Sequence, residues 1–335
     1  MVAMTRTEFI STGMYVPERV VTNDDISQIM DTSDEWIQSR SGIRERRWVE
    51  PDGMLGSDLA VEASKVALER AGMKASELDA IIFATVSPDY FFPGNGVYLQ
   101  TKLGLDTIPC LDVRNQCSGF LYGLSIADAW IRIGQYKRVL LVGSELQSTG
   151  MDATTRGRDI AVLFGDGAGA AILGPTSDPG RGVLSTHLYA DGSGAGILFC
   201  DLGGCAHKPR ITPEHLEQGL QWPVMVGREV FKHASTRMPQ AVRTALETNG
   251  LGLDDIKLLI PHQANLRISE MVQKKLGLRD DQVYNNIQRY GNTTAASIPI
   301  ALHEALGEGR IARGDLVVLA AFGAGLTWGS AAVRW

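Results

Sequence analysis

Short apolar runs alternate along the chain with segments whose apolar residues recur at helical spacing. The runs carry almost no polar residues, which is typical of strands buried on both faces of a sheet. They cover residues 81–86, 108–113, 139–142, 258–260 and 316–320. The amphipathic segments that predict helices cover 58–70, 118–133, 242–249, 266–276 and a stretch ending near Leu306. This alternation predicts an α/β fold with mainly parallel sheets.

Glycines stand just past four of the predicted helices, where a residue in the left-handed conformation is favoured. They are Gly72, Gly134, Gly250 and Gly277. Residues 88–96 and 191–212 are rich in glycine, proline and aromatic side chains instead. These two stretches are therefore predicted to be loops beside a functional site.

Two parts of the sequence copy each other. Residues 57–79 and 235–257 share an Ala-Leu-Glu triplet and a glycine at the same spacing, and each leads into an apolar run. A literal Lys-Leu-Gly-Leu then follows at 102–105 and again at 275–278. The chain therefore looks like two related units fused together.

A second layout is repeated in residues 112–143 and 284–320, in the order short strand, small-residue turn, helix, glycine, strand. In this layout Cys117 falls opposite Asn292, while His262 closes the strand equivalent to the first apolar run. Equivalent strand ends from two related halves can meet near a pseudo-twofold axis. We therefore expect a site between the halves.

The length of 335 residues is natural for two fused units around one shared core. We place the first half at residues 1–174 and the second at 175–335. The boundary falls in the turn-rich stretch 174–182.

The bulk composition is that of an ordinary globular protein with a net charge of −6. This acidic balance argues against nucleic acid as a partner, and an acidic macromolecule would need a local basic patch. No apolar run approaches the roughly 18–20 residues that span a membrane, and the N-terminus has no signal-like segment. The four cysteines show no pairing pattern, so a reducing cytoplasm is the expected location.

Cys117 is the candidate nucleophile, because it lies between a predicted strand and a predicted helix. The unsatisfied N–H groups at a helix start favour a thiolate. Ser118 and Gly119 are small and let a substrate carbonyl approach the backbone. Most cysteines in proteins merely pack in the interior. Cys117 differs from Cys110, Cys200 and Cys205, which do not lie between a predicted strand and a predicted helix.

His262 and Asn292 are the candidate partners of Cys117, because all three follow matching strand ends of the two halves. Each alone has an ordinary structural interpretation, as a hydrogen-bonding histidine and a turn asparagine. Together they suit acyl transfer, in which a thiolate carries the acyl group and two donors stabilise an oxyanion or enolate. The other histidines show no metal-ligand spacing, so no metal site is expected.

At these residues the chain resembles β-ketoacyl-acyl-carrier-protein synthase III, a family of the thiolase superfamily. The matching stretches are 31–37 (DTSDEWI), 41–47 (SGIRERR), 117–120 (CSGF), 164–170 (FGDGAGA), 262–268 (HQANLRI), 291–293 (GNT) and 322–330 (FGAGLTWGS). The resemblance implies a layered αβαβα thiolase fold, a homodimer, and Cys117, His262 and Asn292 as the catalytic triad.

The family's reaction would begin when an acyl-CoA acylates Cys117. Malonyl-acyl-carrier-protein would then lose carbon dioxide and attack the acyl-enzyme, with no metal or redox cofactor. By the same resemblance, the backbone N–H groups of Cys117 and Ala324 would form the oxyanion hole. Phe164 and Phe322 would line the acyl pocket, and Phe92 would reach the acyl pocket of the partner subunit.

The resemblance also implies binding surfaces for the two carriers of acyl groups. Residues expected to contact CoA are Trp36, Arg40, Arg158, Arg228 and Asn265, with Trp36 and Arg40 on either side of the adenine. Residues expected to dock the acidic acyl carrier protein are Lys232, Arg267, Lys274 and Lys275.

Several positions depart from the familiar family pattern. Gln116 and Ser118 flank the nucleophile where alanines are common, and Ala324 and Leu326 replace a glycine and a phenylalanine. These changes leave the starter acyl group open. The leading expectation is an enzyme that starts fatty-acid chains. The alternatives are a related ketosynthase or acyltransferase for a secondary metabolite or signal, using a longer or aromatic acyl-CoA, and a catalytically silent binding protein of the same fold.

Overall fold

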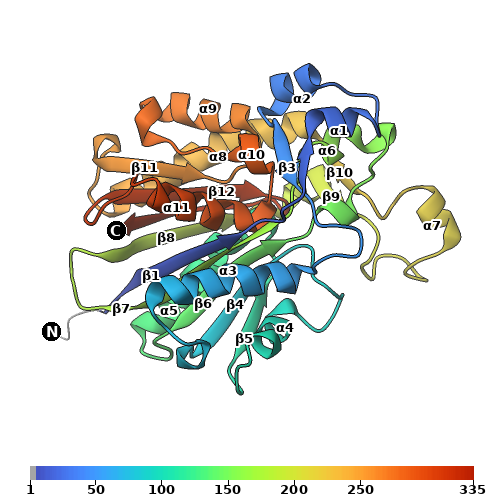
Figure 1. Cartoon of the computed structure of the whole chain (residues 1–335). Coiled ribbons are helices and arrows are strands. Elements are labelled where there is room, and N and C mark those ends of the chain that lie inside the picture. The colour runs from blue at the N-terminus through green and yellow to red at the C-terminus, as the bar shows by residue number, and fades with distance from the viewer. Residues whose placement is uncertain (1–4) are drawn as a thin grey trace.

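Two mixed β-sheets form the framework of the molecule in the computed structural model, which describes residues 5–335 (Figure 1). The first sheet has the order β1-β7-β6-β4-β5 and the second has the order β11-β12-β13-β8. The strands of the first are β1 (Arg6–Tyr15), β4 (Ala80–Ala84), β5 (Cys110–Val113), β6 (Val139–Glu145) and β7 (Gly167–Thr176). Those of the second are β8 (Gly182–Ala190), β11 (Ile256–Pro261), β12 (Leu316–Gly323) and β13 (Thr327–Arg334).

Helices lie between the two sheets and on both outer faces (Figure 1). The buried pair is α5 (Gly119–Arg132) and α11 (Ser297–Gly307), and one apolar cluster joins them to strands of both sheets. Helices α3 (Gly56–Ala71) and α4 (Asn95–Lys102) cover the first sheet, while α8 (Gly227–Thr248) and α9 (Leu266–Leu276) cover the second. These five layers confirm the predicted αβαβα thiolase-like fold.

Short elements border the region above the strand ends. The helices are α1 (Asn23–Ser27), α2 (Asp34–Ser41), α6 (Arg158–Ala161), α7 (Pro213–Glu217) and α10 (Ile287–Tyr290). The strands are β2 (Val20–Thr22) paired with β3 (Glu45–Arg47), and β9 (Leu198–Cys200) paired with β10 (Pro223–Met225).

The duplication read from the sequence is visible in the strand pairing. Ala80 pairs with Val139 in the first sheet and Leu258 pairs with Val317 in the second, so equivalent residues lie 178 positions apart. In both sheets this parallel pair is followed by two antiparallel pairs. The first sheet ends at Thr176 and the second begins at Gly182. The division into halves at residue 174 stays a prediction, since one core spans both.

The two turns that precede α5 and α11 are also equivalent. They are η2 (Gln116–Ser118) and η8 (Thr294–Ala296), and each holds one non-glycine residue at positive φ, Gln116 at 43° and Thr294 at 49°. The counterpart of Cys117 is therefore Ala295, and the predicted alignment with Asn292 is wrong by three residues. The loops before the two turns differ in length, which the sequence layout did not register.

The sheets are mixed, so the prediction of mainly parallel sheets is wrong in their outer parts. Only the β4–β5, β4–β6 and β11–β12 pairs are parallel. Uniformly apolar runs reveal strands buried on both faces. Strands such as β7, with the sequence GAGAAILGPT, are buried through small residues instead and leave a weaker signal.

Three further expectations need correction. The strand predicted at 108–113 is the short edge strand β5, whose Leu111 is 36% exposed rather than buried. The short strand expected at Tyr284 is a single bridge between Leu259 and Val283. The helix predicted at 242–249 is the end of α8, which begins at Gly227 and continues through Pro239. A charged first half and an internal proline concealed most of this helix.

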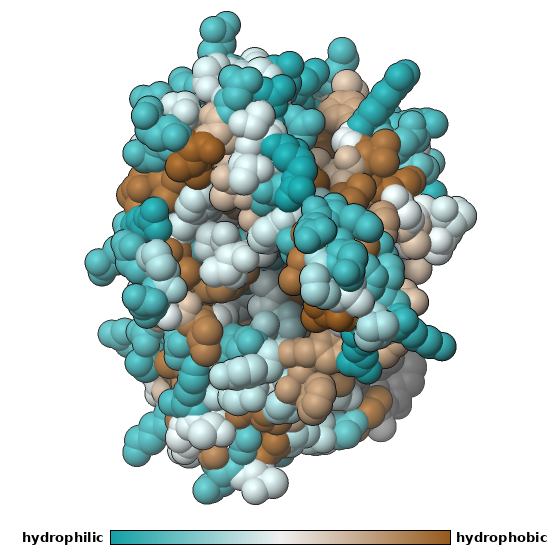
Figure 2. Space-filling view, turned by 90° about the vertical axis from the view of Figure 1, so that its right-hand side faces the viewer, coloured by the Kyte–Doolittle hydropathy of each residue, from teal (hydrophilic) through white to brown (hydrophobic). Residues whose placement is uncertain are grey.

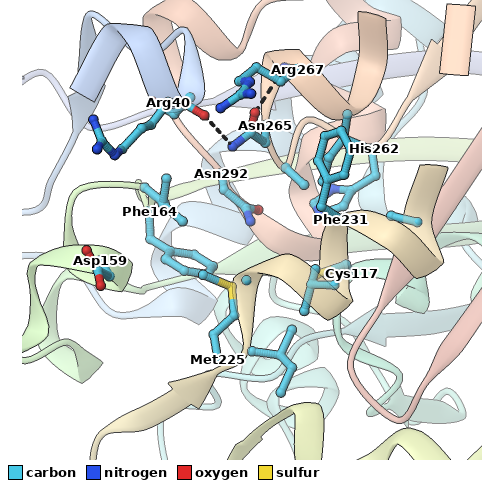
Figure 3. A pocket seen from close by; sticks show the side chains of 18 of the residues that line it. Arg40, Cys117, Asp159, Phe164, Met225, Phe231, His262, Asn265, Arg267 and Asn292 are labelled. Carbon is cyan, nitrogen blue, oxygen red and sulfur yellow. Dashed lines mark hydrogen bonds between the residues drawn. The ribbon is translucent and has the colours of Figure 1, made fainter. Parts of the chain in front are cut away.

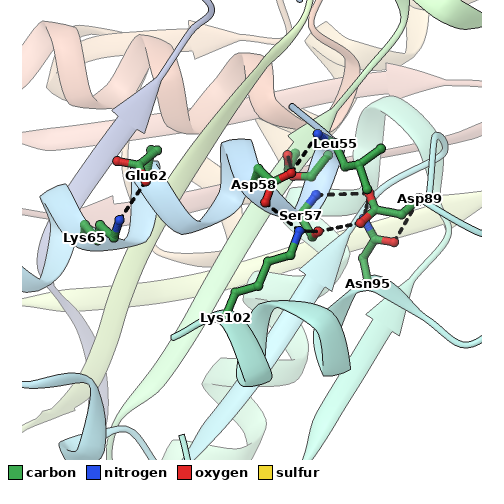
Figure 4. Close-up of polar contacts among 10 residues, drawn as sticks. Leu55, Ser57, Asp58, Glu62, Lys65, Asp89, Asn95 and Lys102 are labelled. Atoms are coloured by element: carbon green, nitrogen blue, oxygen red, sulfur yellow. Dashed lines mark hydrogen bonds and ion pairs between the residues drawn. The ribbon is translucent and has the colours of Figure 1, made fainter. Parts of the chain in front are cut away.

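A polar cluster fixes the loop between β4 and α4 against α3 (Figure 4). Asp89 accepts hydrogen bonds from the Ser57 N–H and hydroxyl groups, and it exchanges two hydrogen bonds with Asn95. The Lys102 ammonium donates to Ser57 at 2.6 Å and pairs with Asp58. The cluster therefore anchors the loop segment that carries the aromatic residues Tyr90–Phe92.

Candidate active site

Cys117 sits in the tight turn η2, between edge strand β5 and the buried helix α5. Because β4 and β5 run parallel, this turn lies at the edge of the sheet where the carboxyl ends of both strands meet. Gln116 takes the left-handed conformation that reverses the chain there. The thiol-bearing side chain is 8% exposed and lines two cavities.

His262 and Asn292 line the first of these cavities together with Cys117 (Figure 3). This cavity has a volume of about 570 Å³. His262 follows β11 and donates its backbone N–H to Ala320 at 2.7 Å. The backbone of Asn292 forms a bridge with Phe164. The two halves thus bring the three predicted side chains to one cavity.

The amide of Asn292 has a defined orientation. Its Oδ1 accepts a hydrogen bond from the Thr294 N–H at 2.9 Å. The amide oxygen is therefore assigned to the protein side, because only the oxygen can accept this bond. The amino group is left to donate to a ligand in the cavity.

His262 is a neutral donor. Burial lowers its pKa to about 3, so the imidazole carries no charge near neutral pH. The Ser297 hydroxyl lies 2.7 Å from Nδ1 and accepts from the Gln263 N–H, so its proton is available to Nδ1. The proton of the ring then belongs on Nε2, which is buried without a partner among the described residues. Sequence reasoning missed Ser297, which is the first residue of α11, because only the end of this helix, near Leu306, was predicted.

Cys117 does not have the stabilised thiolate that its place before a helix predicted. Burial, and to a smaller extent the nearby Glu145 carboxylate, together raise the pKa of the thiol to about 12. Desolvation of a thiolate therefore outweighs the effect of the helix terminus. The thiol is therefore protonated near neutral pH, and the proton must leave as the acyl donor arrives.

The loop between β12 and β13 packs directly on the nucleophile. A Cβ atom on Gly323 would lie 2.8 Å from the Cβ of Cys117 and 3.1 Å from its backbone nitrogen. The Ser118 and Thr327 hydroxyl oxygens are 2.6 Å apart, and Thr327 donates to the Ala324 carbonyl at 3.0 Å. Only glycine at 323 permits this approach, and Ala324 lines the second cavity together with Cys117. The role of their backbone N–H groups as an oxyanion hole stays a prediction.

The residues expected to bind CoA gather at the first cavity. Trp36, Arg40, Arg228 and Asn265 line it, and Arg158 lies outside its lining. The Arg40 and Arg158 guanidinium groups nevertheless lie 4.3 Å and 5.1 Å from the centre of the Trp36 ring. The Asn265 side chain also donates to the Arg40 carbonyl and caps α9, so it joins the two walls of the cavity.

The second cavity lies beyond Cys117 and has a volume of about 720 Å³. Phe164 lines both cavities, whereas Phe322 lines only the first. Phe92 lines neither cavity and is 79% exposed on the surface. The expectation that Phe92 enters the acyl pocket of a partner subunit stays a prediction. Both loops expected beside the site contribute to this lining, through Pro88, Asp89, Ala195 and residues 198–200.

The basic residues expected to dock a carrier protein are exposed. Arg267, Lys274 and Lys275 lie on α9, and Arg267 also lines the first cavity. Lys232 lies on α8, where its ammonium is 3.7 Å from Glu229. Figure 2 shows a hollow near the centre of the face formed by the short elements around α2 and α6, with apolar residues along its rim.

Within residues 5–335, no three histidine, cysteine, aspartate or glutamate side chains are placed to hold a metal ion. Among the helices of the same residues, none is long and apolar enough to cross a bilayer.

The five-layer fold and the cysteine beside two neutral donors define a thiolase-fold acyltransferase. Family models confirm and narrow this class. The model for 3-oxoacyl-[acyl-carrier-protein] synthase III matches residues 111–192, and that for its C-terminal region matches residues 246–335. The chain therefore belongs to the β-ketoacyl-acyl-carrier-protein synthase III family.

Individual relatives match this chain over nearly its whole length. The β-ketoacyl-[acyl-carrier-protein] synthase III of Caldanaerobacter subterraneus is 46% identical over 97% of both chains. The crystal structure of the Aquifex aeolicus synthase III matches with a TM-score of 0.90 at 41% identity, covering 98% of this chain and 100% of that one. The priming β-ketosynthase of the R1128 polyketide pathway is also similar, with a TM-score of 0.89 and 33% identity, covering 99% of this chain and 97% of that one.

Proposed function

We propose that this acyltransferase starts fatty-acid chains by condensing a short acyl group from acyl-CoA with malonyl-acyl-carrier-protein. One observation carries the proposal: Cys117 shares a cavity with two neutral donors, His262 and Asn292, whose acceptor atoms are already used within the protein. Such a site can hold an acyl group on sulfur and stabilise a developing enolate.

In the first step the Cys117 sulfur attacks the thioester carbon of the acyl-CoA. The bond from this carbon to the CoA sulfur breaks, and CoA leaves as a thiol with the proton that Cys117 gives up. The backbone N–H groups of Cys117 and Ala324 stabilise the oxyanion. The close packing of Gly323 on Cys117 supports this role.

In the second step the malonyl thioester carbonyl accepts hydrogen bonds from His262 Nε2 and the Asn292 amino group. The carbon–carbon bond to the malonyl carboxylate breaks, and carbon dioxide departs. The resulting enolate attacks the acyl carbon and displaces the Cys117 sulfur as a thiolate, which gives the β-ketoacyl product. The thiolate then takes up one proton from the solvent and restores the neutral thiol. Decarboxylation drives the step, so the proposed reaction needs no metal or redox cofactor.

A second candidate is a ketosynthase that takes a longer or aromatic acyl-CoA for a secondary metabolite or signal. The volume of about 720 Å³ beyond Cys117 favours it, as does the similarity to a priming β-ketosynthase of a polyketide pathway. The same three residues would carry its chemistry, so only the starter acyl group separates the candidates.

Both substrates would reach the site through the first cavity. The half-buried indole of Trp36 and the guanidinium groups of Arg40 and Arg158 can stack on an adenine once one guanidinium moves aside. Arg228 and Asn265 would contact the rest of CoA. The exposed cations Lys232, Arg267, Lys274 and Lys275 would dock the acidic acyl carrier protein.

We also propose a homodimer in the cytoplasm. The edge strand β5 leaves Leu111 exposed, and the neighbouring aromatic residues Tyr90, Phe91 and Phe92 are more than half exposed. An open strand edge with exposed apolar side chains favours association with a second copy. The four cysteines are free thiols, which fits a reducing compartment.

Incubation with a panel of acyl-CoAs, read by intact-protein mass, tests the proposal. We expect short acyl groups to add to the wild type and no acylation of Cys117→Ala. Preference for long or aromatic chains would favour the second candidate. Absence of any adduct on the wild type would overturn both and leave a binding protein of the same fold.

A further inference from the structure

Glu145 is a buried carboxylate that the proposed reaction does not use. It is the last residue of β6 and is fully buried. Among the described residues no salt bridge reaches it. An isolated carboxylate is costly to bury without many hydrogen bonds.

Six donors surround this carboxylate. On the β4 side they are the Thr85 hydroxyl, the Val86 and Ser87 N–H groups and the Ser87 hydroxyl, at 2.7–3.3 Å. The Gln147 amide donates at 3.2 Å, and the Ala295 N–H donates from the second half at 3.3 Å. Glu145 therefore ties the turn η8 to the loop after β4.

The duplication gives this contact a counterpart in the catalytic half. With equivalent residues 178 positions apart, Glu145 corresponds to Gly323 and Ala295 corresponds to Cys117. Gly323 packs on the backbone nitrogen of Cys117, next to the expected oxyanion hole. At the same place in the other half, the Glu145 carboxylate accepts the N–H of Ala295.

We infer that Glu145 fills the second half's counterpart of the oxyanion hole, where its carboxyl oxygen accepts the Ala295 N–H and positions the turn following Asn292. Ala295 belongs to this turn, and the Asn292 amide is oriented by the Thr294 N–H one residue earlier. Glu145 is thus a positioning residue for the decarboxylation donor. The inference rests on the proposed function, since it assigns that role to Asn292.

The same carboxylate acts on Cys117 through its charge, because it raises the pKa of the thiol in addition to burial. Other charged or titratable groups also line the two cavities beside the sulfur. They are Arg40, Asp159, Arg228, His262 and Arg267 in the first, and Asp89, Arg114 and Cys200 in the second. A substitution at Glu145 leaves all of these in place, so a change in thiol titration reports on Glu145.

Glu145→Gln is the decisive variant, because it keeps the size of the side chain but removes the charge and one acceptor oxygen. We expect the pH midpoint of Cys117 alkylation by iodoacetamide to move to lower pH. We also expect malonyl-acyl-carrier-protein decarboxylation, measured without acyl-CoA, to fall about tenfold more than acylation by acetyl-CoA. An unchanged alkylation midpoint, or equal losses in both rates, would overturn the inference.

A second variant controls the result. Asp166→Asn makes the same change at another buried carboxylate, which accepts from Val49, Gln147 and Ser148 but not from η8. It should lower the melting temperature without changing the ratio of the two rates or the alkylation midpoint. A change in either after Asp166→Asn would count against a specific role for Glu145.

If Glu145→Gln does not fold, the variant Glu145→Asp tests the inference instead. It keeps the charge, so the alkylation midpoint should stay near that of the wild type while decarboxylation falls selectively. Proportional loss of both rates would overturn the inference. The alkylation readout needs no acyl-CoA, so it separates failure of this inference from failure of the proposed function.

Discussion

At the scale of single residues, the site depends on where protons reside. The sequence identifies Cys117, His262 and Asn292, but burial sets their protonation: a neutral thiol and a neutral imidazole. Ser297 directs the imidazole proton towards the cavity, and Thr294 directs the Asn292 amino group there. Both donors are therefore preorganised for an oxyanion before substrate binds.

Asn292→Ala should impair decarboxylation much more than self-acylation. The substitution removes one of two donors to the malonyl enolate, and loss of such a donor costs roughly 100-fold. The measurement compares carbon dioxide release from malonyl-acyl-carrier-protein with the rate of Cys117 acylation by acetyl-CoA. Equal losses in the two rates would contradict the assigned role.

Ser297→Ala should slow decarboxylation by about tenfold, because the imidazole loses the hydroxyl that fixes its proton on Nε2. Ser297→Thr is the matched control, since it keeps a hydroxyl at the same position. Steady-state rates on malonyl-acyl-carrier-protein test this, with ¹⁵N NMR to identify the tautomer. A normal rate in Ser297→Ala would remove Ser297 from the mechanism.

At the scale of elements, two strand-to-helix turns and one strand-to-strand loop build the site. The turn η2 presents Cys117, and the hydroxyl contact between Ser118 and Thr327 holds the loop after β12 against it. Helix α9 begins beside His262, capped by Asn265, and presents exposed cations along its length. The elements that carry the chemistry thus also frame the entrance.

The double variant Arg267→Glu with Lys274→Glu should raise the KM for malonyl-acyl-carrier-protein by about tenfold while sparing acyl-CoA. Reversed charges repel an acidic carrier but leave the Trp36 region intact. Lys137→Glu with Arg313→Glu is the control, because both residues precede strands, at the ends opposite the site. If KM rises alike for both substrates, the docking surface lies elsewhere.

At the scale of the whole molecule, duplication makes two similar frameworks, of which one holds the catalytic cysteine and the other holds Ala295 and Glu145. The two outer helical layers cover the sheets, and the shared pair α5 and α11 joins them in one core. The site lies where the halves meet, so its geometry depends on packing across the entire chain.

The free energy of unfolding should depend on pH because Glu145 is buried. Burial raises its pKa from 4.5 to about 7, so the unfolded chain loses this proton first and stability falls as the pH rises between these values. Glu145→Gln should remove this fall, on the order of 3 kcal/mol at most. Urea unfolding at pH 5 and pH 7.5 measures it, and an equal pH difference in both proteins would refute the assignment.

The sequence by itself determined the fold class, the duplication and the family, because apolar periodicity and short motifs are local properties of the chain. It also indicated the residues that meet at the first cavity, although its match of Cys117 with Asn292 was wrong by three residues, because strand ends of related halves converge even where their loops differ in length. Only the tertiary structure showed that the sheets are mixed, that Ala295 is the counterpart of Cys117 in the second half, and that the Cys117 thiol is neutral. These features depend on burial and on contacts between distant segments, such as Glu145 with Ala295, which no local pattern records.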